Sequence, residues 1–312
     1  MTTFGFLATN GNSQVLISSK TKNLHFLGKA TLYSTLQSHE GRGGIRRWAY
    51  RIDSTGTPVP FFSVPTADRY AIVRMTKVTG ITWEIEVIRS GTSGSVPEVY
   101  VFTEITGQHR PTGAWGMQVL NEIDSTPAYD SRLKPLVVRG GTNVTPPYDP
   151  MTSLPTGLSP RYCSTNADGL FVPNNYSSTV VYNTNVTKPI VCYQSVAQTM
   201  RQVDVNESSE RCWGFKVFGN CVGFEGKKSW DSHYWTFFRA GVSAEQSGPH
   251  SYINTGWISV DYGCRNEEKE SDSFIGIGYD DDSSAAGNWP FSNLTINLTS
   301  VSLIVSDGVL YD

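Results

Sequence analysis

The sequence is poor in charge and has no long apolar run. Charged residues make up 17% of its 312 positions, below the roughly 25% of an average soluble protein. No apolar stretch approaches the roughly 18 residues that a membrane-spanning helix needs. The net charge of -3 provides no basic field that would hold a nucleic acid. These shortages argue against membrane insertion, nucleic-acid binding and a fold built from long amphipathic helices.

The familiar catalytic motifs are also missing. The chain contains no G-x-S-x-G, H-E-x-x-H, Walker A or G-x-G-x-x-G pattern, and nothing nominates the pair of carboxylates that a glycosidase requires. We expect a structural or surface role for each histidine, namely His25, His39, His109, His233 and His250. The sequence therefore predicts no enzyme, no catalytic residue and no cofactor.

Patterns for metal binding are weak. None of the five cysteines has the C-x2-C spacing of a zinc site, and the choice between buried thiols and disulfides stays open. These cysteines are Cys163, Cys192, Cys212, Cys221 and Cys264. The adjacent carboxylates of Asp280, Asp281 and Asp282 form a calcium candidate, but the residues that follow lack the ligand spacing of an EF-hand loop. A solvated acidic loop is the preferred interpretation.

Strand signals dominate the sequence. Runs rich in β-branched and aromatic residues, such as 70–75, 81–88 and 99–102, are separated by turn clusters in a chain with 29 glycines and 16 prolines. The one helix candidate, about 196–203, is short. We therefore predict an all-β fold with β-sandwich-like architecture and little helix.

A proline-rich stretch suggests where the chain divides. Residues 140–160 contain five prolines, and proline cannot donate a hydrogen bond within a central strand. We predict an N-terminal β-sandwich domain over residues 1–140 and a linker or arm over 141–160. A C-terminal β-rich domain is expected over 161–312.

An internal repeat is the most informative pattern. The segments that begin at Phe4-Gly5 and Trp115-Gly116 align with a single inserted residue. The alignment matches Gly5, Asn10, Ser19 and Leu24 with Gly116, Asn121, Ser131 and Leu136. A looser third copy is expected at Gly214, Asn220, Ser232 and Phe237. The pattern predicts a recurring β-hairpin whose conserved spacing serves folding and not catalysis.

Each repeat position has an expected physical role. The asparagine should lie where a positive φ or an Asx-turn is needed, and the serine should bond backbone where the returning strand ends. The glycine after the aromatic residue suggests close packing of another strand. The two apolar positions that follow the glycine should share one face of the hairpin.

The repeat resembles a known kind of protein. Residues 115–138 contain, in order, an aromatic residue and glycine, an alternating strand, an asparagine, a short loop and then aromatic-Asp-Ser-basic. This pattern is similar to a segment of minor tail and baseplate-associated virion proteins of tailed bacteriophages. The resemblance covers residues 1 to about 140. It implies a non-enzymatic structural subunit that assembles with copies of itself and with other virion tail proteins.

Two further expectations accompany this resemblance. The first ten residues have neither a basic region nor a sustained apolar region, so we expect synthesis in the host cytoplasm without a signal peptide and a final location in the virion. The alternative function is a receptor-binding module that recognises a host cell-surface glycan, because sugar rings stack on indoles. The tryptophans that motivate it are Trp213, Trp230, Trp235, Trp257 and Trp289.

Overall fold

The computed structural model describes the chain as antiparallel β-structure. The described residues are 7–9, 15–18, 22–37, 45–64, 69–90, 95–144, 178–184, 186–193, 198–217, 220–247, 250–279, 291–297 and 301–312. Within these ranges the only helix is the short 3-10 helix η1 (Gly308–Leu310). The predicted all-β class is confirmed.

The strand bounds follow in chain order. Before the proline-rich stretch they are β1 (Leu7–Thr9), β2 (Val15–Ser18), β3 (His25–Lys29), β4 (Thr31–Gln37), β5 (Ile45–Asp53), β6 (Val59–Ser63), β7 (Tyr70–Thr79), β8 (Thr82–Ser90), β9 (Val99–Thr103), β10 (Gln118–Leu120), β11 (Pro127–Asp130) and β12 (Gly140–Val144). After it they are β13 (Ser178–Thr184), β14 (Pro189–Cys192), β15 (Gln198–Val217), β16 (Asn220–Ser247), β17 (His250–Tyr279), β18 (Phe291–Asn297) and β19 (Val301–Asp307). The predicted strand runs near residues 70, 81 and 99 correspond to β7, β8 and β9.

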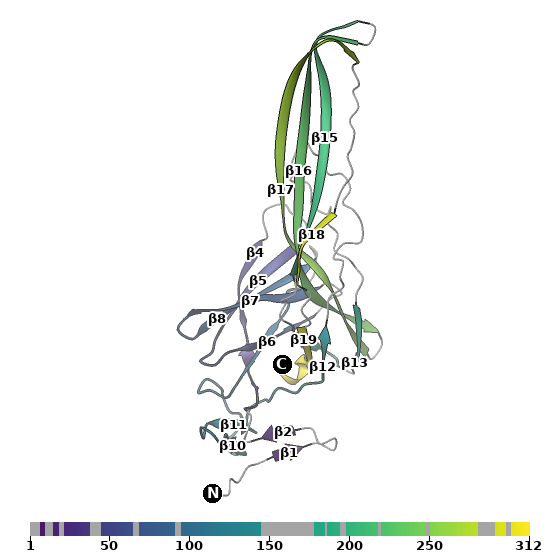
Figure 1. The fold of residues 1–312 in the computed structure, drawn as a ribbon. Helices are drawn as coiled ribbons and strands as arrows, with labels where there is room; N and C mark the ends of the chain where they lie inside the picture. The colour runs from purple at the N-terminus through teal and green to yellow at the C-terminus, as the bar shows by residue number, and fades with distance from the viewer. Residues whose placement is uncertain are drawn as a thin grey trace.

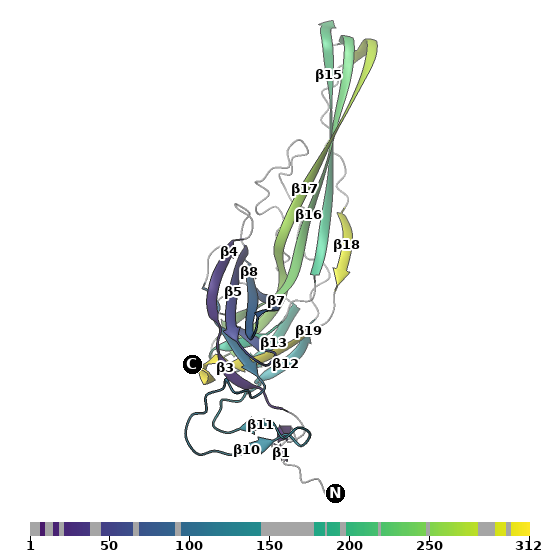
Figure 2. The same ribbon diagram turned by 90° about the vertical axis from the view of Figure 1, so that its left-hand side faces the viewer.

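Two large sheets form the body of the molecule (Figure 1). The six-stranded sheet has the order β12-β19-β14-β6-β9-β3. The nine-stranded sheet follows the path β13-β17-β16-β7-β8-β5-β4, with β15 joining β16 to β18. Two separate hairpins, β1-β2 and β10-β11, lie together beyond the sandwich near the N-terminus (Figures 1 and 2).

The expected division into separate domains at residues 141–160 is wrong. β14 pairs with β6 and β16 pairs with β7, so both sheets combine strands from the two sides of that stretch, and β12, which pairs with β19, includes residues 141–144 of the expected linker itself. Each half alone would leave strand edges and apolar faces uncovered, whereas the combined sheets bury one shared core. Residues 145–160, which hold the five prolines, lie outside the described part of the chain.

The core explains why β9 shows no alternation between apolar and polar residues. Val99 and Val101 pack in the main cluster between the two sheets, with Phe62, Tyr70 and Ile258. Every residue of β9 is buried, which requires that both faces of its sheet be covered. The six-stranded sheet therefore has a second apolar layer on its other side.

That second layer comes from segments distant in sequence. Tyr100 and Phe102 pack there with Phe61 and with Tyr311 from the end of the chain. The rings of Phe102 and Phe61 have centroids 5.1 Å apart at 71°, and those of Phe102 and Tyr311 are 4.8 Å apart at 84°. Such edge-to-face contacts are the favoured geometry for aromatic pairs. Leu24 and Leu136, which are matched in the repeat, both border this cluster.

A three-stranded ribbon extends from the nine-stranded sheet. β15, β16 and β17 have 20, 28 and 30 residues, far beyond the usual 3 to 10. Ala240 and Val242 of β16 and Ile253 and Ile258 of β17 are core residues, while the other end of these strands stands clear of the sandwich strands (Figures 1 and 2). A β-bulge between Phe237 and Phe238 lies just beyond the core residues.

The ribbon corrects two local expectations. The helix candidate at 196–203 falls mostly in β15, which begins at Gln198, and the charged run 266–272, whose local composition favours an exposed loop, lies within β17. In both cases continuous pairing along β16 overrides local propensity. Among the described residues there is no helix of the length and hydropathy that crossing a membrane would require.

Candidate assembly site

The two repeated segments form the same hairpin. In β1-β2 the pairs are Leu7 with Ser18, Ala8 with Ile17 and Thr9 with Val15, with a bulge after Ala8. In β10-β11 the matched pairs are Gln118 with Asp130, Val119 with Tyr129 and Leu120 with Pro127, with the bulge at the matched place. The repeat alignment thus predicts the register residue by residue. Gly5, Asn10 and Ser19 lie outside the described residues.

The second hairpin shows what two of the repeat positions do. Asn121 is 5% exposed, and its Oδ1 accepts a hydrogen bond from the Ile123 backbone N–H at 2.9 Å, which is the predicted Asx-turn. The backbone N–H of Met117 donates to Ser131 Oγ at 2.8 Å, where the returning strand ends. Both side chains replace backbone hydrogen bonds that the short hairpin cannot make.

The glycine and the Asp-Ser-basic triplet act together, which sequence reasoning missed. The Arg132 backbone N–H and its Nε each donate to Asp130 Oδ1 at 2.9 Å. The hydrogen bonds from the Arg132 side chain lower the pKa of Asp130 to about 2. A methyl group on Gly116 would overlap Arg132 Cγ. The glycine is therefore needed for a neighbouring side chain, and not for the close packing of another strand.

The third expected copy does not have this structure. Its register would place Lys216 opposite Asp231, but Lys216 pairs with Cys221, and Asp231 pairs with Asn206. Val217 pairs directly with Asn220, so only two residues separate β15 from β16, and loop length fixes hairpin register. Gly214 lies in β15, while Asn220, Ser232 and Phe237 all lie within the long strand β16.

The two true copies meet at their equivalent leucines. The Leu136 N–H donates to the Leu24 carbonyl at 2.8 Å, next to the antiparallel bridge between His25 and Pro135. The Asn23 N–H also donates to the Ala128 carbonyl at 2.9 Å. The two copies are thus joined by backbone hydrogen bonds of residues 23–24, which follow the first hairpin, and through the leucines they contact the second apolar layer of the sandwich.

Two buried histidines lie at this junction. His25 is fully buried and His109 is 6% exposed, and their ring centroids are 6.3 Å apart. His25 Nδ1 is 3.1 Å from the Asn23 carbonyl oxygen, and His109 Nε2 is 3.4 Å from that of His25. Burial lowers the pKa of His25, so the neutral ring is favoured and the pair has the structural role expected for histidines in this chain.

The surface of the second hairpin carries exposed apolar side chains. Trp115 is 94% exposed and Ile123 is 83% exposed, and Met117 and Leu120 are about half exposed. A monomeric surface commonly shows single apolar residues, and four exposed ones between residues 115 and 123 favour a contact site. We call Trp115, Met117, Leu120 and Ile123 the hairpin patch.

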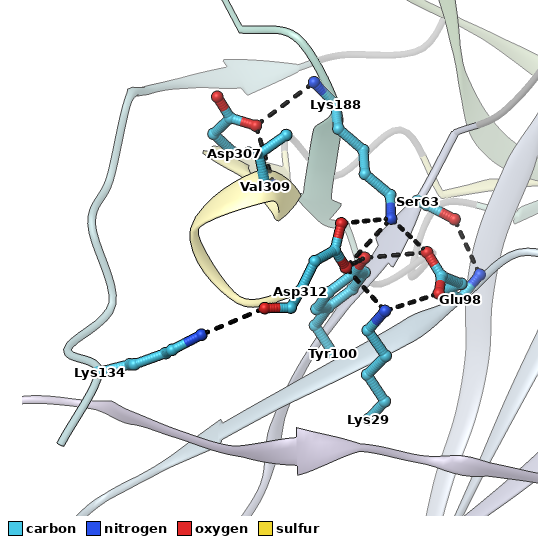
Figure 3. A network of polar contacts seen from close by, with 9 residues as sticks. All are labelled: Lys29, Ser63, Glu98, Tyr100, Lys134, Lys188, Asp307, Val309 and Asp312. Atoms are coloured by element: carbon cyan, nitrogen blue, oxygen red, sulfur yellow. Dashed lines mark hydrogen bonds and ion pairs between the residues drawn. The ribbon is translucent and has the colours of Figure 1, made fainter. Parts of the chain in front are cut away.

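A polar network fixes the last residue of the chain to the six-stranded sheet (Figure 3). Lys188 Nζ lies 2.6 Å from Glu98 and 2.9 Å from Asp312, and Lys29 Nζ lies 2.7 Å from each of these carboxylates. Tyr100 Oη lies 2.8 Å from Asp312 and 2.9 Å from Glu98, and its single proton can be donated to either carboxylate.

The network keeps both carboxylates ionised. Partial burial alone would raise the pKa of Glu98, but the hydrogen bonds from Lys188, Lys29 and Tyr100 lower it to about 2. Hydrogen bonds from Lys29 and Lys188 lower the pKa of Asp312 as well. Neither group is tuned toward neutral pH as a general acid would be. This arrangement is a structural clamp that holds η1 against the sheet.

The remaining candidates add no site. Asp280, Asp281 and Asp282 lie outside the described residues. In the ranges that are described, no group of three or more histidine, cysteine or acidic residues could hold a metal ion. Cys192 is a free thiol whose pKa is raised to about 11 by burial. No family model, no curated protein and no solved structure matches the chain.

Proposed function

We propose that the chain is a non-enzymatic structural component of a bacteriophage virion, located in the tail and acting by assembly with copies of itself and with other tail proteins. The observation that carries the proposal is the repeat. The segment whose sequence resembles phage tail proteins occurs twice as a hairpin with one register. In the better described copy, the characteristic side chains stabilise the hairpin, while the four apolar residues of the hairpin patch remain exposed.

The chemistry of the described residues is consistent with this role. The strongest cluster of titratable groups, around Glu98 and Asp312, is neutralised by two lysines. By contrast, the hairpin patch is apolar and solvent-exposed, and a patch of that kind gains free energy when a partner covers it. A partner at the hairpin patch would be held mainly by packing, and the assembly symmetry would multiply each weak contact.

Purified particles of the virus that encodes the chain provide the test. Quantitative mass spectrometry should find the chain at a fixed ratio to the tail proteins, and tails separated from heads should retain it. The variant Ile123→Ser should be incorporated at a reduced ratio, because it removes an exposed apolar contact. The same substitution at Ile81, a partly exposed residue in the β7-β8 turn, is the control and should be incorporated normally.

The same experiment distinguishes the alternative. If particles lack the chain, the structural proposal is wrong. If the isolated chain adsorbs to host cells, and soluble cell-surface glycan competes with that adsorption, the receptor-binding function replaces it.

A further inference from the structure

The distal ribbon has an uninterrupted register across three strands. From Gly223 to Phe237, each residue of β16 pairs with one residue of β15 and one of β17, without a bulge. Residues opposite one another in a sheet share a face, and successive residues along a strand alternate between faces. The composition of the two faces can therefore be assigned row by row from the backbone pairing alone.

The rows near the free end differ sharply between the faces. One face has the row Trp213, Phe224 and Phe274, and the next row on that face pairs Phe215 with Val222. The opposite face at the same height has the rows Gly214, Gly223, Ile275 and Cys212, Glu225, Ser273. Five large apolar residues thus fall on one face, which we call the aromatic face.

The aromatic face continues toward the sandwich. Its rows there include Val203, Tyr234 and Cys264, and Val205 and Tyr262 lie in the adjacent rows. Between these apolar groups, one row holds Arg211 and Asp272, the next holds Lys228 and Glu270, and a third holds Glu207, Trp230 and Glu268. The first two rows carry both signs of charge, so the like charges that a second identical face must accommodate are those of the third row.

A single layer of strands needs a cover for such a face. Three strands become stable when an apolar face is buried against another layer. The sandwich lies at the other end of the ribbon (Figure 1), and among the described strands β18 pairs with β15 only between Gln198 and Val203. Among the described strands, only β15, β16 and β17 extend to the far end of the ribbon, where this row lies (Figure 1).

The size of the face suits a second copy. Aromatic side chains bury about 150–250 Å² each, so the four aromatic residues of the two end rows would supply on the order of 800 Å², close to the contribution of one partner to a stable interface. Edge pairing is discouraged because the β17 edge contains the charged run Glu267 to Asp272. Face-to-face packing of identical ribbons satisfies both conditions.

We propose that copies of this chain associate through the aromatic face of the β15-β16-β17 ribbon, where Trp213, Phe224 and Phe274 share one cross-strand row. This deepens the assembly function proposed above and rests on it for the choice of a second copy over another occupant. The ribbons then form the shared stalk of a homo-oligomer, and each sandwich lies at the base of its own ribbon.

Adjacent residues on β17 provide a matched test. Phe274 lies on the aromatic face and Ile275 on the opposite face, so Phe274→Asp and Ile275→Asp place the same charge one residue apart. Analytical ultracentrifugation of the full chain should show an oligomer for the wild type and for Ile275→Asp. Phe274→Asp should raise the dissociation constant by about 100-fold or more. Circular dichroism should show that both variants remain folded.

Several outcomes would overturn the proposal. A wild-type chain that is monomeric at about 50 µM, or two variants with equal dissociation constants, contradicts it. If the wild type is monomeric and Phe274→Asp lowers its melting temperature, another part of the same chain covers the face. If the wild type is monomeric and glycan binding depends on Phe274, the occupant is a sugar. A monomeric chain that is nevertheless present in particles overturns only this inference, and an oligomer absent from particles overturns only the proposed function.

Discussion

The sandwich and the distal ribbon are built from similar strands but solve the problem of burial differently. In the sandwich, β9 has apolar neighbours on both faces, and its residues come from a run without alternation. At the far end of the ribbon, the end rows have aromatic residues on one face and glycine, polar residues and Ile275 on the other. The sandwich covers both faces of β9 within one chain, whereas the end of the ribbon is a single sheet with most of its apolar residues on one face. Strand content alone therefore does not show whether both faces of a sheet are covered within one chain.

The largest expected difference between these regions is the cost of truncating a buried aromatic residue. Phe102 is fully buried and contacts Phe61 and Tyr311, so Phe102→Ala should lower the free energy of unfolding by about 3–5 kcal/mol. Ile275→Ala in the ribbon, whose row neighbours Gly214 and Gly223 are glycines, should cost less than about 1 kcal/mol. Urea denaturation measures the free energy of unfolding of both variants. Equal losses would contradict the expected difference between the sandwich and the ribbon.

The border between the regions should be sensitive to a single methyl group. Gly241 pairs with Gly256, and a Cβ at Gly241 would overlap the Ile258 side chain and lie 3.1 Å from the Tyr70 carbonyl oxygen. Gly241→Ala should therefore destabilise by about 1–3 kcal/mol, although alanine normally improves a strand. Gly107, with nothing within 4 Å of a Cβ, is the control, and Gly107→Ala should leave the melting temperature nearly unchanged.

A smaller effect should separate the true hairpin repeat from the ribbon. Asn121→Ala removes the acceptor for the Ile123 N–H and should cost about 1 kcal/mol, with faster hydrogen exchange at that amide. Asn121→Asp retains an acceptor oxygen and should restore protection. Asn220→Ala, at the position that only resembles Asn121 in sequence, should change stability by less than about 0.5 kcal/mol. A similar loss of stability in both variants would contradict the expectation that the different strand registers give the two asparagines different roles.

The smallest effect concerns the polar clamp of the sandwich. Lys188→Met removes ion pairs that are partly exposed, so it should cost only about 0.5–1 kcal/mol at pH 7. The folded-state pKa of Glu98 is lowered from 4.5 to about 2. The stabilisation is therefore complete above pH 4.5 and is lost as the pH falls toward 2. The gap between wild type and variant should close over that range in denaturation measured against pH, and Arg110→Met, at an exposed loop cation, should show no such closure.

Local pattern predicted the strands and the first repeat well, because both depend on residues close in sequence. The alignment of Ala8 with Val119 and of Ile17 with Tyr129 predicted paired residues in both hairpins. The Asx-turn at Asn121 was predicted for the same reason. By contrast, the pairing of β6 with β14 joins residues more than a hundred positions apart, and no short-range signal indicates it. The prolines of 140–160 suggested a domain boundary because composition indicates the local backbone conformation. It does not indicate which distant strands pair in the folded protein.

The residues of the candidate site also include some that the local sequence predicts and some that it does not. Gly116 and Ser131 were identified from spacing, but the pairing of Asp130 with Arg132 that explains the glycine was missed. A signal for it was present, since two opposite charges flank Ser131 in the sequence. The ribbon register could not be foreseen, because the two-residue loop after Val217 overrides the spacing from Gly214 to Ser232.

The position of β19 has a consequence for how the protein is made. β19 lies between β12 and β14 in the six-stranded sheet, yet it follows both of them in the sequence and leaves the ribosome after them. Until residues 301–307 emerge, β12 has no neighbour on that side, and β14 presents an open edge. Pairing between strands that are distant in sequence is slow. The nascent chain therefore exposes unpaired strand edges in this sheet until β19 has paired. We expect this sheet to be completed only after residues 301–307 have been synthesised, and its folding in cells to benefit from chaperones that shield strand edges.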